Sequence, residues 1–310
     1  MTGGNAAHPR SAAVLAQRVE HWLVPLVLGV AVIGVAFPTP GRRLADADGI
    51  PVALAVLVAS TGVSITLGQV RQTRSATGRL TVVLAVTSVT LPALAWAASH
   101  LTNPGPLRDG FLVTGVAPAE VASVAIAGIA GGGAALTAAL LIGSTLVTVV
   151  AAGPILAALG ATATISPTAL LTQLVLVVAL PLAAGITTRA TLRPTRSLLS
   201  IFAALGTLAL LVLLWQVASQ ITLRGPYVSV TLALLAFLAG SAGLGWLLTL
   251  GLPPPRRLAL ALPVAMRDFA VAAGIAAAAF GPAAAAPLGI YGVLVLLAGA
   301  LAVQRPRART

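Results

Sequence analysis

Residues 262–274 read LPVAMRDFAVAAG, and this stretch decides how the chain folds. Arg267 and Asp268 stand side by side near the middle of a segment that is otherwise apolar and long enough to cross a bilayer. Pro263 precedes the arginine by four residues. A charge at bilayer depth costs roughly 2.5–3.5 kcal/mol on insertion scales, so it normally faces the protein interior or a water-filled path. The stretch therefore predicts an interrupted helix with a functional charge.

A second stretch, residues 117–128, reads APAEVASVAIAG and follows the same plan. Pro118 is followed by Glu120 and then by Ser123, again inside an apolar span. If Pro118 is laid on Pro263, Ser123 falls at the position of Asp268. Two interrupted spans at corresponding places in two halves of a chain indicate a transporter binding site.

The composition is that of a polytopic membrane protein, with 58% hydrophobic and 8% charged residues in 310. The net charge of +12 comes entirely from arginine. In a membrane protein such arginines lie in cytoplasmic loops, so we expect the lipid bilayer, and not nucleic acid, as the partner. Cysteine is absent and the three histidines are scattered, so no metal site and no cofactor are expected.

Apolar runs of about 20 residues, the length that crosses a bilayer, recur along the chain. We expect a single membrane domain over 22–304, flanked by cytoplasmic tails at 1–21 and 305–310. Five spans per half give opposite orientations to repeat 1 (about 22–160) and repeat 2 (about 167–304), which is the inverted-repeat plan. The ten expected spans are 22–37, 50–68, 79–98, 109–128, 133–159, 167–187, 197–219, 227–250, 257–279 and 284–303.

Arginine counting predicts the orientation of these spans in the plasma membrane. With ten spans both termini share one side, which receives 13 of the 18 arginines, whereas the other side receives 4 and Arg267 lies within a span. Positive residues concentrate on the cytoplasmic side of membrane proteins. Both termini are therefore expected to be cytoplasmic.

Several motifs resemble the bile acid:sodium symporter family, of which the chain looks like a divergent, bacterial-type member. They are the Pro118 stretch, residues 129–137 (IAGGGAALT), Ser144-Thr145-Leu146, and residues 266–272 (MRDFAVA) with the later Phe280 and Tyr291. The resemblance implies an all-α membrane protein of ten transmembrane helices, whose broken helices 4 and 9 cross between a panel domain and a core domain. It also implies a substrate and sodium site at this crossing.

Departures from the family pattern fall on the sodium ligands that the resemblance implies. The expected asparagine after Ser123 is valine, the glutamate is Pro263, the ninth-helix asparagine is Asp268, and the third-helix glutamine falls near Thr87. Only Ser123, together with Thr137, would remain if a sodium site persists. We therefore expect H⁺-linked or uncoupled transport, with Na⁺ as the coupling ion only if the sodium site persists.

The predicted function is secondary active transport of a small organic anion by alternating access, proton-linked or uncoupled. The substrate or ion site is predicted at Thr87, Pro118, Glu120, Ser123, Thr137, Pro263, Arg267 and Asp268. In this hypothesis a carboxylate carries the proton and Arg267 receives the anion. The alternative is a non-transporting membrane sensor or assembly subunit on the same scaffold, which would bind a ligand without flux. No catalytic constellation is present, so an enzyme is not expected. The oligomeric state is left open.

Overall fold

The computed structural model describes residues 25–66, 68, 77–129, 134–161, 167–221 and 227–304. Within these residues the chain is helical, and its only β contact is an isolated antiparallel bridge between Ala119 and Arg267. After a first helix, Pro25–Ala36, come α2 (Pro38–Asp46), α3 (Gly49–Ser64), α5 (Thr77–Ser99), α6 (Pro106–Val116), α7 (Ala122–Ile129) and α8 (Ala134–Ala158). The second part of the chain holds α9 (Pro167–Leu174), a π-helical turn (Val175–Ala179), α10 (Leu180–Leu192), α11 (Arg196–Ser219), α12 (Tyr227–Leu248), α13 (Pro254–Ala265), α14 (Phe269–Phe280), a 3₁₀ turn (Pro282–Ala285) and α15 (Ala286–Gln304).

Six of the described helices are long and apolar enough to cross a membrane, or seven if the bent pair Pro25–Ala36 and Pro38–Asp46 forms one span. The chain is thus an all-α integral membrane protein. Of the remaining expected spans, one corresponds to the 16-residue α3, and the other two are made of shorter pieces, because α6, α7, α13 and α14 are each 8 to 12 residues long. At 1.5 Å per residue, none of these pieces crosses about 30 Å of hydrocarbon alone. The count of ten spans therefore stays a prediction. Eight of the 17 arginines that set the predicted orientation lie outside the described residues.

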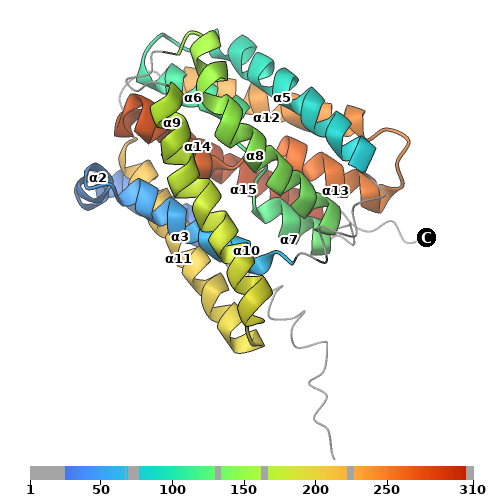
Figure 1. The fold of residues 1–310 in the computed structure, drawn as a ribbon. Coiled ribbons are helices and arrows are strands. Elements are labelled where there is room, and N and C mark those ends of the chain that lie inside the picture. Colours follow the sequence, from blue (N-terminus) through green and yellow to red (C-terminus); the bar gives the residue numbers. More distant parts are fainter. Residues whose placement is uncertain are drawn as a thin grey trace, which may run out of the picture.

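The helices form two groups that lie side by side (Figure 1). We call α2, α3, α9 to α10 and α11 the panel, because α3 packs along both α10 and α11, and α2 packs on α11. We call α5 to α8 and α12 to α15 the core. The two groups meet mainly where α9 contacts α8 and where α11 contacts α15, and also where α3 contacts α14.

Close packing in the panel depends on glycine. A Cβ atom on Gly185 of α10 would lie 2.2 Å from the carbonyl oxygen of Ala59, and one on Gly62 of α3 would lie 2.5 Å from that of Leu182. Without a driving force from water, helices in a membrane associate through such close backbone approach of small residues. The α3–α10 contact is a backbone-to-backbone contact with no room for a methyl group.

We expect Gly185→Ala to lower the stability of the protein by roughly 1–3 kcal/mol, because the added methyl group meets backbone that cannot rotate away. The melting temperature of the purified protein in detergent measures this. Gly243→Ala in α12 is the matched control, since no atom lies within 4 Å of its Cβ position. An equal melting temperature for Gly185→Ala and the wild type would contradict the packing described here.

Candidate functional site at the crossing of two broken helices

Two helix breaks cross in an antiparallel arrangement, as the resemblance implied. We call residues 117–121 and 266–268 the crossing. The backbone N–H of Glu120 donates to the carbonyl of Met266 at 2.9 Å, and that of Asp268 donates to the carbonyl of Pro118 at 2.8 Å. These reciprocal bonds form the Ala119–Arg267 bridge. Two unwound segments therefore satisfy each other's backbone groups inside the protein, as non-helical backbone at membrane depth must do.

The first break follows from Pro118. The residue before a proline is driven out of the helical region, and Ala117 is extended, with φ −60° and ψ 151°. The second break has a different cause and position. Pro263 lies inside α13, and the helix ends only at Ala265, before the extended Met266. The sequence-based alignment of Pro118 with Pro263 was therefore wrong in register. The local two-fold symmetry of the bridge makes Glu120, and not Ser123, equivalent to Asp268.

The charges of the crossing complement the dipoles of the half-helices. Asp268 caps α14, since its Oδ1 accepts from the N–H groups of Ala270 and Val271, both at 2.9 Å. Glu120 stands at the start of α7, where its Oε1 accepts from the N–H of Ala122 at 3.4 Å. Helix N-termini favour negative charge and C-termini favour positive charge. Each carboxylate thus lies at a positive helix end.

Arg267 lies at a negative helix end. Its guanidinium donates to the carbonyl of Ala117, the residue that ends α6, and its own backbone N–H donates to the Tyr291 hydroxyl at 3.2 Å. Among the described residues no ion pair joins Arg267 to Glu120 or Asp268. The three buried charges of the crossing are therefore not held by pairing of Arg267 with a carboxylate.

Successive residues of an extended segment point to opposite sides, and this separates the charges. Arg267 lines a small cavity inside the core, which we call the arginine cavity. Asp268 lines a small cavity between panel and core, which we call the carboxylate cavity. Glu120 lies on the side of Asp268, because Ala119 and Arg267 are paired in the antiparallel bridge and share one face, so that the residues that follow them share the other.

The carboxylate cavity is lined by residues of both helix groups. The panel contributes Val58 and Thr61 of α3 together with Val178 and Leu182, and the core contributes mainly apolar side chains beside Asp268. This mixed, mostly apolar lining with one convergent carboxylate is typical of small-molecule sites.

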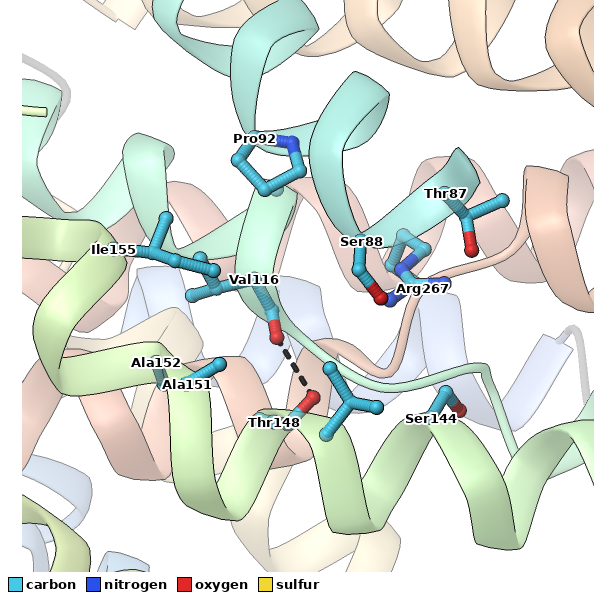
Figure 2. Close-up of a pocket in the computed structure, with 12 residues that line it drawn as sticks. Thr87, Ser88, Pro92, Val116, Ser144, Thr148, Ala151, Ala152, Ile155 and Arg267 are labelled. Carbon is cyan, nitrogen blue, oxygen red and sulfur yellow. Dashed lines mark hydrogen bonds between the residues drawn. The ribbon is translucent and has the colours of Figure 1, made fainter. Parts of the chain in front are cut away.

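Figure 2 shows Arg267 in the arginine cavity, between Thr87 and Ser88 of α5 and Ser144 and Thr148 of α8. Thr148 donates to the carbonyl of Val116 at 2.8 Å. Thr87, the expected counterpart of the family's glutamine, thus lies beside Arg267 and lines the same cavity.

Two atoms of the crossing are buried without a hydrogen-bond partner in the described part of the chain. They are Oε2 of Glu120 and Nε of Arg267, in residues that are 4% and 7% exposed. Buried charged atoms are normally paired, so an unpaired one indicates a bound proton, water, ion or ligand. Both N–H groups that Asp268 accepts bind its Oδ1, whereas Glu120 accepts through Oε1 and leaves Oε2 buried without a partner.

The remaining predicted residues serve the helices themselves. The hydroxyl of Ser123 donates to the carbonyl of Glu120 at 2.5 Å, and the hydroxyl of Thr137 donates to the carbonyl of Ala259 at 2.8 Å. Ala259 stands four residues before Pro263, so its carbonyl is the one that the proline leaves without a helical partner. Thr137 occupies this carbonyl. A role of Ser123 or Thr137 in ion binding stays a prediction.

Thr137→Val tests the packing role of Thr137. We expect the free energy of unfolding to fall by about 1–3 kcal/mol, since the buried carbonyl of Ala259 loses its donor. Thermal melting in detergent measures the change, and the exposed Thr81→Val, whose hydroxyl bonds only within its own helix, is the control. A melting temperature that stays at the wild-type value would contradict the role.

Sequence reasoning did not assign two hydroxyls of the crossing to the site. Ser144 accepts the N–H of Ala119 at 3.0 Å, and Tyr291 accepts that of Arg267. They occupy equivalent places on the two sides of the bridge. The available signal was Tyr291 itself, because a tyrosine deep in an apolar span needs a hydrogen-bond partner.

The profile of the SBF-like CPA transporter family matches residues 21–306 of the chain. The chain belongs to this family. The membership confirms the resemblance to the bile acid:sodium symporters and makes the protein a membrane transporter by family. No curated protein matches the chain.

Proposed function

We propose that this member of the SBF-like CPA transporter family moves a small organic anion across the plasma membrane by alternating access, linked to protons and independent of sodium. The panel and the core would rock against each other around the crossing, with ten spans in two inverted repeats and both termini in the cytoplasm. The local two-fold arrangement of Glu120 with Asp268 and of Ser144 with Tyr291 supports the inverted repeat.

One observation carries the proposal: Oε2 of Glu120 is buried and unpartnered at the crossing. A carboxylate in a dry site can gain or lose a proton when its surroundings change, as they do during alternating access. This mechanism needs no sodium ligands, and it fits the loss of the ligands that the resemblance implied.

In this proposal the anion binds at the carboxylate cavity, which widens as the panel and the core move against each other. When Glu120 and Asp268 are charged, they occupy the positive ends of α7 and α14 and would repel an anion. Protonation lowers this repulsion and leaves the half-helix ends to attract a carboxylate. The apolar lining, which includes Leu141 and Leu182, suits the body of an amphipathic molecule. The substrate class is therefore an organic acid with an apolar part.

Uptake and efflux of labelled carboxylates and sulfated steroids in proteoliposomes test this function. We expect flux of at least one class when a pH gradient is imposed in sodium-free buffer. Absence of gradient-driven flux across a broad panel would contradict it, and ligand binding without flux would favour a sensor.

A second candidate is exchange of a cation for protons. The observation that favours it is the placement of two carboxylates on one side of the crossing, one with a free oxygen. The test is to impose a pH gradient on proteoliposomes and to add single cations in the absence of any organic anion. Loss of the gradient on addition of a cation would support this candidate over the first.

A further inference from the structure

The side-chain hydroxyls that line the arginine cavity all use their protons elsewhere. Thr87 and Ser88 donate to carbonyls of their own helix at 2.7 and 2.6 Å, Ser144 donates to Leu141 at 3.0 Å, and Thr148 donates to Val116 at 2.8 Å. A hydroxyl whose proton is engaged has only acceptor lone pairs left to offer. The arginine cavity therefore presents oxygen acceptors on two sides, from α5 and from α8.

The backbone adds to this negative lining. The cavity lies at the C-terminal end of α6, where Gly115 and Val116 line it and the carbonyl of Ala117 accepts from the guanidinium. Carbonyl groups at a helix C-terminus carry partial negative charge. Apart from Arg267 itself, the side chains that line the cavity carry no charge. The surroundings are those of a site for a monovalent cation.

We propose that the arginine cavity is a monovalent-cation site that the protein fills with its own guanidinium group. Arg267 is 7% exposed and is held by the bridge to Ala119, so this cation cannot dissociate. The unpartnered Nε leaves one donor for a water molecule. An anion is disfavoured in this cavity, because every side-chain oxygen that faces it is an acceptor.

A tethered cation has one consequence for transport, which rests on the proposed function: a free cation such as sodium has no vacant place in the core. The site itself is independent of that consequence. The proposed cation site predicts which ions stabilise the protein, and this prediction can be tested without measuring flux.

Removal of the side chain should turn the cavity into a site for a free guanidinium ion. We expect Arg267→Ala to melt several degrees below the wild type and to regain much of this loss in millimolar methylguanidinium chloride. Equimolar methylurea, a neutral compound of similar shape, should restore nothing. Arg257→Ala is the matched control, because Arg257 stacks on Trp246 at 4.5 Å outside the cavity. It should respond to neither compound, like the wild type.

Three results would overturn the proposal. They are an equal response of Arg267→Ala to methylguanidinium and methylurea, no response to either, or stabilisation of the wild type by acetate that Arg267→Ala loses. If Arg267→Ala does not survive extraction, extraction in methylguanidinium must yield monodisperse protein. A protein that aggregates even in methylguanidinium would also contradict the proposal. Arg267→Met, which fills the space without charge, must also melt below the wild type.

Discussion

Replacing Glu120 with glutamine is expected to reduce proton-driven flux to the level of protein-free liposomes while the protein remains folded. Glutamine keeps the shape of the side chain and an oxygen that can accept from the N–H of Ala122. It cannot titrate, so the proton cycle stops although the helix end stays satisfied. The measurement is uptake by proteoliposomes across a range of external pH values, with the melting temperature recorded in parallel.

Asp46→Asn is the control for this variant, because Asp46 is exposed at the end of α2. It removes one carboxylate from the chain and should leave the pH dependence unchanged. Retention of the wild-type pH profile in Glu120→Gln would show that another group carries the proton, and Asp268 would be the next candidate.

Asp268→Ala is expected to lose both stability and transport, whereas Asp268→Asn should keep most of the stability. Alanine leaves the N–H groups of Ala270 and Val271 without an acceptor at the start of α14. Loss of such a cap costs about 0.5–2 kcal/mol. Asparagine retains the accepting oxygen and removes only the charge. Thermal melting and flux, measured on both variants, separate the cap from the charge.

Equal melting temperatures for the alanine and asparagine variants of Asp268 would contradict the capping role. If both retained wild-type flux, the carboxylate cavity would not be the substrate path. The comparison is sharp because the two variants differ in one hydrogen-bond acceptor at one position.

The sequence alone predicted the membrane class, the family resemblance and the two broken helices. Pro118 gave the first break because a proline restricts the residue before it. The second break was predicted too early, at Pro263, because a proline is tolerated within a membrane helix when a neighbouring group bonds to the freed carbonyl. Thr137, from α8, does so. The contact of Thr137 with Ala259 joins residues far apart in the chain, so no local pattern could reveal it.

The directions of the charges could not be predicted either. Arg267 and Asp268 are adjacent in sequence, and a helical reading would place them about 100° apart on one helix. The extended bridge sends them into two different cavities. That bridge exists only when both breaks are present and aligned, so the separation of positive and negative charge is a tertiary property.

The central claim is that transport through the crossing is linked to protons and does not need sodium. Its most direct test is to record the internal pH of proteoliposomes loaded with a pH-sensitive dye. Addition of a transported organic anion in sodium-free buffer should change the internal pH in the wild type and leave it unchanged in Glu120→Gln. A signal that requires sodium, or one that is equal in both proteins, would contradict the account.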